Sequence, residues 1–411
     1  MMTSTHTVLD SVALGYQPVW NRSRQLAAVR MPVLVLHRES VDGEHFVRAL
    51  GNDWPKAAPA LIIAPRSLPL VDQLLHLPPI PNTWLEVPGD LFATPEGLAR
   101  MAVAARQGHR LLRRVALSAI AGEVVAPADV RSLVHLAPED VLATLRSLPT
   151  EPGGAPRGRS PLMAGHIYEG IANRVVAEHA LDTAGAWGVL GWPVDDTLRF
   201  FRQRPLACDR ATIQQVTQAL GRECSLDQLE RLIRQDPVMV YRVLLLVNSA
   251  MHGKDREINS LRHAIMMLGF TVLGRWLSEQ LPGAETDLTL HPVRYTMVMQ
   301  ARLAQHLLDS GSDDNLRSEV YVTALFAQLD RLLHQPLPEI LQRLPLPGRV
   351  YDALLRQTGP YNAYLDVSDA QGQTEQLHRL PQICEKHDIS LESANQALIR
   401  MLATSRDHRQ G

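Results

Sequence analysis

The sequence has few cysteines, no long apolar run and almost no excess of charge, and each absence excludes a class of protein. Cys208, Cys224 and Cys384 are its only cysteines, and they form no CxxC pair. Their spacing argues against a disulfide framework or a zinc site and fits the reduced thiols of a cytoplasmic protein. No apolar run approaches the roughly 20 residues that a membrane helix needs. Residues 1–15 lack the basic segment and apolar core of a signal peptide, so we expect a cytoplasmic protein without a membrane segment.

The composition is that of an ordinary globular protein. Apolar residues make up 45% of the chain and charged residues 20%. The formal net charge of −2 argues against a general surface for nucleic acids or anionic membranes. A length of 411 residues predicts two or three domains. We therefore expect a multidomain protein that binds no nucleic acid.

The first half of the chain alternates short apolar runs with amphipathic stretches, a pattern that predicts βαβ units. About eight such runs in the first half could close a compact (β/α)8-type barrel. From about Phe200 onward the pattern is helical only. We therefore predict an α/β barrel domain over residues 8–200 and an all-helical domain over residues 202–400. The predicted strands are Val12–Val19, Ala28–Leu36, Pro59–Ala64, Thr83–Val87, Arg110–Leu117, Ser132–Leu136, Met163–Tyr168 and Trp187–Gly191.

Three segments of the helical half follow one another in a characteristic order. Leu229–Pro237 ends in Asp236-Pro237, a favourable helix start, because Asp can cap free amides and Pro suits the first helical turn. Leu244–Ala250 and Ile258–Gly269 follow it. In order and spacing, these segments resemble an HDOD domain, a helical relative of the HD phosphohydrolases that is regarded as a regulatory output module. The resemblance implies a domain that binds a protein partner.

The same resemblance implies a loss of metal chemistry in the helical half. Active HD enzymes carry a His-Asp dyad on a helix, with further ligands around a divalent metal. Ala327 and Gln328 stand where the dyad is expected, within a predicted helix over Val322–Asp330. Six methionines can either fill the core of this domain or form an adaptable groove for a partner. They are Met239, Met251, Met266, Met267, Met297 and Met299.

Four segments of the barrel half resemble parts of an EAL domain, the barrel module that hydrolyses cyclic-di-GMP. Gln17-Pro18-Val19 resembles its opening strand, and Trp84–Val87 resembles a strand that supplies a metal-binding Glu. Ile167–Ile171 and Gly185–Pro193 resemble two later strands. The resemblance implies a TIM-like barrel of EAL type, in degenerate form. Three residues are then candidates for a residual ligand site, namely Gln17, Glu86 and Glu169.

Most ligands of an active EAL domain are missing from the corresponding positions. Met31 stands where the resemblance places the Glu of the name motif, and a thioether is a poor ligand for a hard cation. Ile62 stands in place of an Asn, and Leu111–Arg114 in place of an Asp-Asp pair. The catalytic Lys of the family has no clear equivalent near Leu133–Leu136. We therefore expect no catalytic residue, no metal and no cofactor.

Glu86 and Glu169 admit two interpretations. Each can simply pair with an Arg at a strand end, or the two can retain part of a ligand site. Arg113 or Arg114 can pair with these carboxylates or contact an anionic ligand. The sequence alone does not choose between these arrangements.

The sequence as a whole predicts a non-enzymatic bacterial signalling regulator or scaffold, in which an inactive EAL-like barrel precedes a protein-binding HDOD domain. Two alternatives stay open. One is a receptor that binds cyclic-di-GMP without cleaving it, and the other is a weak cyclic-di-GMP phosphodiesterase that acts through Glu86 and Glu169. The expected partner is a protein of a signalling pathway, and a homodimer also stays open.

Overall fold

The chain divides into two compact units. Unit 1 comprises Met1–Thr197 together with Ala370–Gly411, and unit 2 comprises Leu198–Asp369. This division differs from the predicted domains, 8–200 and 202–400, because the chain from Ala370 onward groups with the barrel. The computed structural model describes residues 7–36, 41–55, 58–121, 130–149, 154–204, 206–222, 224–250, 260–308, 311, 313–344 and 346–405.

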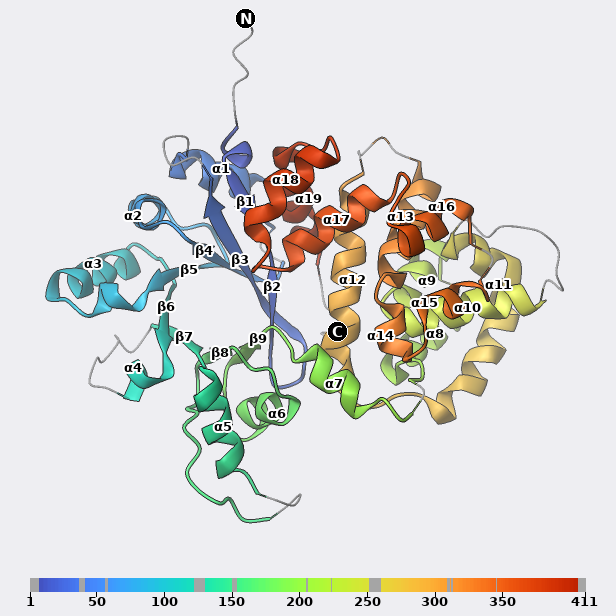
Figure 1. Cartoon of the computed structure of the whole chain (residues 1–411), viewed down its shortest axis with the longest axis horizontal. Coiled ribbons are helices and arrows are strands. Elements are labelled where there is room, and N and C mark those ends of the chain that lie inside the picture. Colours follow the sequence, from blue (N-terminus) through green and yellow to red (C-terminus); the bar gives the residue numbers. More distant parts are fainter. Residues whose placement is uncertain are drawn as a thin grey trace, which may run out of the picture. The chain divides into compact units, whose positions relative to one another are not determined.

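Unit 1 is built on one sheet, whose strands are coloured from blue to green in Figure 1. The sheet has the strand order β1-β3-β2-β9-β8-β7-β6-β5-β4, and an additional β3–β4 pairing closes strands β2 to β9 into an eight-stranded barrel. The predicted TIM-like barrel is therefore confirmed. The strands are β1 (Val12–Leu14), β2 (Gln17–Trp20), β3 (Leu26–Val35), β4 (Ala60–Pro65), β5 (Thr83–Pro88), β6 (Leu111–Ala116), β7 (Arg131–His135), β8 (Ile167–Glu169) and β9 (Gly188–Leu190).

The first predicted strand, Val12–Val19, is in fact two strands that both pair antiparallel with β3. β2 is also antiparallel to β9, whereas the pairs from β3–β4 through β8–β9 are parallel. Parallel strands direct their carboxyl ends to the same rim of a barrel. Side chains at the ends of β4 to β8 therefore meet at one mouth.

An apolar layer fills the barrel below this mouth. Its members come from seven different strands, because inward-facing positions recur at every second residue of a strand. They are Val19, Ala28, Ile62, Leu112, Leu133, Ile167 and Leu190. Trp84 and Trp187 pack against this layer, and their rings lie 5.1 Å apart between centroids.

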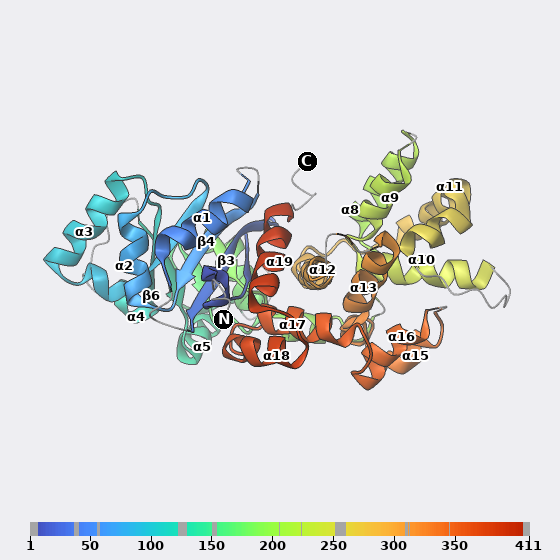
Figure 2. The same cartoon turned by 90° about the horizontal axis from the view of Figure 1, so that it is seen from above.

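Helices alternate with the barrel strands and lie outside them (Figures 1 and 2). Thr94 caps α3 by accepting a hydrogen bond from the amide of Gly97, and Asn173 caps α6 by accepting one from Val176. Such side-chain acceptors satisfy amides that the helix itself leaves free. The helices are α1 (Gly43–Asp53), α2 (Leu68–His76), α3 (Pro95–Arg106), α4 (Leu117–Ala121), α5 (Pro138–Ser147) and α6 (Arg174–Asp182).

The C-terminal part of unit 1 packs on the first strands of the barrel. It contains α18 (Leu380–Lys386) and α19 (Leu391–Thr404), and α19 contacts β1. The fully buried Asn395 of α19 donates to the carbonyl oxygens of Leu9 and Val12, each at 2.7 Å, and accepts from the amide of Leu14 at 3.1 Å. One amide side chain therefore completes hydrogen bonds of three backbone groups near β1.

Unit 2 is helical throughout its described part. Asp236 caps the central helix α10, as predicted, by accepting from the amide of Val238 at 3.0 Å. Eight further helices of different lengths belong to the described part of this unit. The elements are α8 (Arg210–Leu220), α9 (Leu226–Ile233), α10 (Pro237–Ala250), α11 (Leu261–Gln280), α12 (Leu290–His306), α13 (Asp314–Phe326), α14 (Leu329–Leu333), α15 (Leu337–Leu341) and α16 (Gly348–Tyr351). Helices α7 (Val194–Phe200) and α17 (Asn362–Gly372) cross the divisions between the units.

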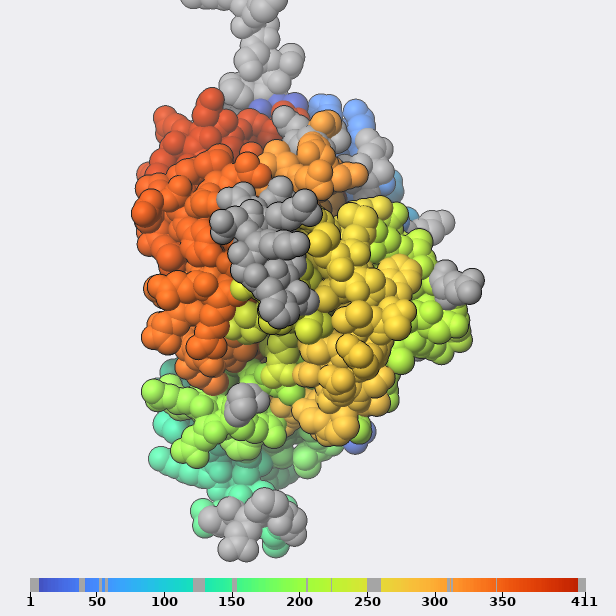
Figure 3. Space-filling model, turned by 90° about the vertical axis from the view of Figure 1, so that its right-hand side faces the viewer, coloured from blue at the N-terminus to red at the C-terminus, as the bar shows by residue number. Residues whose placement is uncertain are grey.

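Helix α11 is interrupted at Gly269, whose φ of 73° is left-handed and therefore favours glycine. The sequence predicted that a helix would stop here, and the backbone does leave the helical conformation before a second helical stretch begins. Figure 3 shows the face of unit 2 on which α11 is drawn in yellow. Residues 258 and 259 of the predicted motif lie outside the described residues.

The methionines of unit 2 divide between the two predicted roles. Met239, Met297 and Met299 are buried and fill the core. Met266 and Met267 of α11 are exposed by 58% and 43%. Met251 lies outside the described residues. In the part of the chain that the structure describes, no helix combines the length and the apolar character of a membrane span.

The contacts of Asn395 lead to a stability prediction. Replacing Asn395→Leu should lower the free energy of unfolding by about 3 kcal/mol, because buried backbone groups would lose their partners. The neighbouring Gln396→Leu, whose side chain only bonds Glu392 within α19, serves as the control and should change it by less than about 0.5 kcal/mol. Urea titrations followed by circular dichroism measure both. Equal losses of unfolding free energy in the two variants would contradict this structural role of Asn395.

Candidate functional site

Polar side chains gather where the parallel strands of the barrel end. Arg66 follows β4 directly, Glu86 and Arg114 lie near the ends of β5 and β6, and His135 and Glu169 are the last residues of β7 and β8. The mouth of a (β/α)8 barrel is where this fold places its functional groups. The three predicted site residues Gln17, Glu86 and Glu169 all belong to one network at this mouth.

Glu86 is held by Arg30 in a two-pronged ion pair. Nε of Arg30 donates to one carboxylate oxygen at 2.6 Å, and Nη2 donates to the other at 2.7 Å. Both residues are buried, with exposures of 1% for Arg30 and 7% for Glu86. Burial by itself would lower the pKa of Arg30, but the hydrogen bonds and negative charge of Glu86 raise it above the usual value. The remaining donor of Arg30, Nη1, bonds the side-chain oxygen of Gln17 at 2.8 Å.

Glu169 is held by Arg114. Nε and Nη2 of Arg114 donate to the same carboxylate oxygen at 3.0 and 2.9 Å. Arg114 also approaches Glu86, at 3.9 Å from its Nε to a carboxylate oxygen. Nδ1 of His135 lies 3.4 Å from the oxygen of Glu169 that Arg114 contacts. The two carboxylates are thus linked through one guanidinium group, which lies between them.

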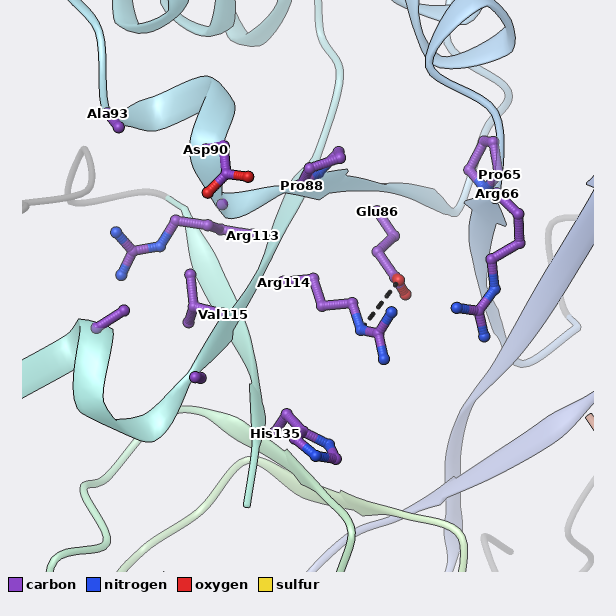
Figure 4. Close-up of a pocket in the computed structure, with 13 residues that line it drawn as sticks. Pro65, Arg66, Glu86, Pro88, Asp90, Ala93, Arg113, Arg114, Val115 and His135 are labelled. Carbon is purple, nitrogen blue, oxygen red and sulfur yellow. Dashed lines mark ion pairs between the residues drawn. The ribbon is translucent and has the colours of Figure 1, made fainter. Parts of the chain in front are cut away.

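A cavity of about 690 Å³ opens at this network. Figure 4 shows Arg66, Arg114 and His135 directed toward the space around Glu86, and the dashed line marks the approach of Arg114 to Glu86. Burial lowers the pKa of Arg66, and the positive charges of Arg30 and Arg114 lower it further. Arg66, Arg113 and Arg114 line this cavity together with the carboxylates of Glu86 and Asp90, so arginines outnumber carboxylates there.

Arg113 takes no part in the carboxylate network that the structure describes. It is buried, its guanidinium lies within 3.4 Å of the hydroxyl of Ser132, and it stacks over the ring of Phe92 at 5.9 Å. In Figure 4 its side chain points away from Arg114. Of the two arginines considered from the sequence, Arg114 is therefore the one that pairs with Glu169.

The position of Met31 requires a correction. Paired residues of neighbouring strands face the same side of a sheet, and Arg30 pairs with Ile62 of the inner layer. Met31 pairs with Ile63 and therefore faces outward, where it is fully buried. Because strand side chains alternate, the inward-facing residue at this point of β3 is Arg30. The inward-facing position at which the EAL resemblance implies a Glu is therefore occupied by Arg30 and not by Met31.

The other predicted losses include several positions on the inner face of the sheet. Ile62 lies in the apolar layer inside the barrel. In β6, Leu112 belongs to that layer, and Arg114, two residues later, enters the carboxylate network. His135 ends β7, in the stretch where no lysine equivalent was found. Inward-facing positions thus carry apolar or cationic side chains where the EAL resemblance implies oxygen ligands.

The residues at the mouth do not fit a divalent cation. Hard cations prefer several carboxylate or carbonyl oxygens, but Glu86 and Glu169 direct theirs to guanidinium groups. A cation would also meet the charges of Arg30, Arg66 and Arg114 at close range. Among the described residues no three His, Cys, Asp or Glu side chains are grouped so that they could hold a metal ion.

In unit 2, the two positions at which the HD resemblance places a His-Asp dyad carry other residues. Ala327 and Gln328, expected on a continuous helix, lie between α13 and α14, and the side-chain amide of Gln328 donates to the side-chain oxygen of Gln300.

A buried ion pair lies at the start of α10. The fully buried Asp236 pairs with Arg294 at 2.9 Å. Burial raises the pKa of Asp236, while the charge of Arg294 acts in the opposite direction.

Comparison with known families identifies part of unit 2. Residues 209–343 match the HDOD domain family. These residues form an HDOD domain. The sequence prediction is therefore confirmed for this segment, and the EAL resemblance of the barrel stays a prediction.

Two curated proteins are similar to parts of the chain. The uncharacterized protein YuxH of Bacillus subtilis is 28% identical over 165 residues, which are 39% of this chain and 37% of YuxH. The cyclic di-GMP phosphodiesterase CdgJ of Vibrio cholerae is 26% identical over 188 residues, which are 44% of this chain and 41% of CdgJ. The matches thus span about two fifths of the length of each relative.

One solved structure is also similar. It is the MmoQ response regulator of Methylococcus capsulatus, with 16% identity and a TM-score of 0.38, and the match covers 47% of this chain and 98% of that protein.

Sequence reasoning missed Arg30, the residue that organises the mouth. Its neighbours Val29 and Met31 are apolar and buried, so a lone arginine in the middle of an apolar strand was the available signal. Long charged residues are almost never fully buried unless they are paired. That rule would have directed attention to Arg30 and to a carboxylate across the barrel.

The buried pair leads to a second stability prediction. Arg30→Met should lower the free energy of unfolding by about 3 kcal/mol, because it leaves the Glu86 carboxylate buried with Arg114 only at longer range. Arg66→Met, at an exposed position of the same mouth, is the matched control and should change it by less than about 0.5 kcal/mol. Guanidinium chloride titrations of both variants measure the difference. Similar midpoints for the two would refute a structural role for Arg30.

Proposed function

We propose that the chain is a non-enzymatic signalling regulator, in which a catalytically inactive barrel accompanies a protein-binding HDOD domain. The proposal rests above all on the ion pairs Arg30–Glu86 and Arg114–Glu169 at the barrel mouth. Guanidinium groups take up the oxygens that metal-dependent phosphodiester hydrolysis would need free. Of the other described residues that line the cavity, Asp90 is the one with a carboxylate, and one carboxylate does not supply the several oxygen ligands that two cations need.

Opening these ion pairs costs free energy, and this cost disfavours catalysis. Two-metal hydrolysis requires carboxylates that hold two cations and orient an attacking water. Binding even one cation to Glu86 would require removal of Arg30, whose guanidinium would stay buried and unpaired. Breaking a buried pair in this way costs about 3–5 kcal/mol. The mouth therefore favours its present cationic state over a metal-loaded one.

The HDOD domain supports a role in signalling. CdgJ, one of the relatives, is named as a cyclic di-GMP phosphodiesterase, and this name supports a proposed role in cyclic-di-GMP signalling. Within the proposal the HDOD domain supplies the output by contacting a protein of the same pathway.

A second candidate function is a receptor for cyclic-di-GMP, with or without weak turnover. The observation in its favour is the cavity of about 690 Å³, which is lined by Arg66, Arg114 and His135. Arginine recognises phosphate oxygens through charge-assisted, often two-pronged hydrogen bonds. A dinucleotide could therefore bind through its phosphates without any metal.

One assay separates the three functions. The purified full chain is incubated with cyclic-di-GMP and either magnesium or manganese, products are separated by chromatography, and binding is followed by calorimetry. A pure regulator gives neither product nor heat, a receptor gives heat alone, and a phosphodiesterase gives both. We expect no linear dinucleotide, because the carboxylates are engaged by arginines.

Matched variants make the assay decisive. Turnover that disappears in Glu86→Gln and persists in Glu96→Gln, an exposed position on α3, would refute the non-enzymatic proposal. If binding occurs, Arg66→Gln should weaken it about tenfold, the effect of losing one charge-assisted hydrogen bond. Arg100 pairs with Asp72 away from the cavity, so Arg100→Gln should leave the affinity unchanged.

The partner proposal is tested in cells that express the full chain. Cross-linking through acidic side chains, followed by mass spectrometry, should place cross-links to another protein within residues 209–343. The expected pattern follows from the assignment of the output to the HDOD domain. Cross-links confined to the barrel residues 7–197 would contradict that assignment.

A further inference from the structure

The C-terminal part of unit 1 makes close contact with the loop between β1 and β2. The amide of Tyr16 donates to the carbonyl oxygen of Gln371 at 3.0 Å, and the buried Gln371 side chain donates to the carbonyl oxygen of Leu14 at 3.2 Å. A Cβ atom on Gly15 would lie only 2.9 Å from the Gln371 carbonyl oxygen. This close approach therefore requires glycine at position 15.

Gln17 joins this contact to the barrel mouth. Its Nε2 donates to the hydroxyl of Thr374 at 3.0 Å, and its Oε1 accepts from Nη1 of Arg30 at 2.8 Å. An amide has distinct donor and acceptor ends, so these two partners fix its orientation. Gln17 can satisfy both only while Arg30 and Thr374 keep their present positions.

The series continues from Arg30 into the cavity. Arg30 donates to both oxygens of Glu86, at 2.6 and 2.7 Å. Every step from Thr374 to Glu86 is thus a direct side-chain hydrogen bond, which we name the Thr374–Glu86 relay. Arg30 and Glu86 are buried, whereas Gln17 and Thr374 are half-buried. Hydrogen bonds shielded from water in this way polarise one another and act cooperatively.

The far end of the relay is a short turn. Residues 374–376 form a turn that is followed by a single 3-10 turn, Leu377–Arg379. The amides of Gln376 and Arg379 donate to backbone oxygens that are each only three residues earlier, at 2.9 and 2.8 Å. Such segments open at low free energy and respond to the loss of single contacts. Thr374 also lies four residues after Ala370, where the chain re-enters unit 1.

From this arrangement we infer that the relay is a regulatory device, through which a change at the barrel mouth alters the order of residues 371–379. A ligand that forms new hydrogen bonds with Arg30 or Glu86 moves the Arg30 donor away from Gln17. The side-chain oxygen of Gln17 then loses the partner that fixes its orientation. Gln17 then releases Thr374, and the turn becomes easier to open. The relay therefore ends just beyond Ala370, the point at which the chain re-enters unit 1.

Hydrogen exchange of the full chain, measured by mass spectrometry, tests the relay without any ligand. Glu86→Gln weakens the hold on Arg30, and exchange in peptides covering 371–379 should become about threefold to tenfold faster, as expected for the loss of one net hydrogen bond. Asp90→Asn is the matched control. It makes the same carboxylate-to-amide change in a residue that lines the same cavity, and it should leave these peptides unchanged.

A second measurement approaches the relay from the other end and does not depend on the folding of Glu86→Gln. Thr374→Val should shift or broaden the nuclear magnetic resonance signal of the Arg30 Nε–H group. Thr404→Val is its control, because the Thr404 hydroxyl donates to backbone oxygens of Arg400 and Met401 within α19, away from the relay. Coupling must be reciprocal, so a response from only one end would overturn the inference.

The inference is overturned if exchange at 371–379 is the same in Glu86→Gln as in the wild type, or equally fast in Asp90→Asn. It is also overturned if the Arg30 signal ignores Thr374→Val. None of these measurements involves turnover, cyclic-di-GMP or a protein partner. The relay and the proposed function can therefore fail independently.

Discussion

The buried ion pair between Arg30 and Glu86 is the interaction on which the barrel mouth depends. A carboxylate taken out of water is costly unless it is paired and hydrogen-bonded, and Arg30 meets both conditions by binding both oxygens. The same guanidinium fixes Gln17. Arg114 then bridges toward Glu86 and binds Glu169. The cavity, the balance of charge and the connection to Thr374 all follow from this one pair.

Unit 2 uses a similar solution at the start of its central helix. Asp236 caps α10 and is neutralised by Arg294, which also donates to the carbonyl oxygen of Ala207 at 2.7 Å. In both units a buried carboxylate is engaged by an arginine, which balances its charge and accounts for its hydrogen bonds.

The sequence predicted the main architecture well where the signal was periodic and local. The βα alternation, the change to helices near Phe200, the Asp236 cap and the break at Gly269 all depend on neighbouring residues. The HDOD motifs combine such local signals, and the family match covers them. The prediction was weaker wherever distant segments meet. The grouping of residues 370–411 with the barrel depends on Asn395 and Gln371, whose partners lie more than 350 residues earlier.

The sequence by itself determined which residue types are present at the mouth, including Gln17, Glu86 and Glu169. Through the family resemblances it also predicted that ligands of a metal-dependent enzyme are missing. Only the tertiary structure decided which side chain of β3 faces inward, because a shift of one residue moves a strand side chain to the opposite face. That geometry replaced Met31 by Arg30 as the informative residue. It also decided that the carboxylates are paired, since each pair joins two strands that are separated by one other strand around the closed barrel.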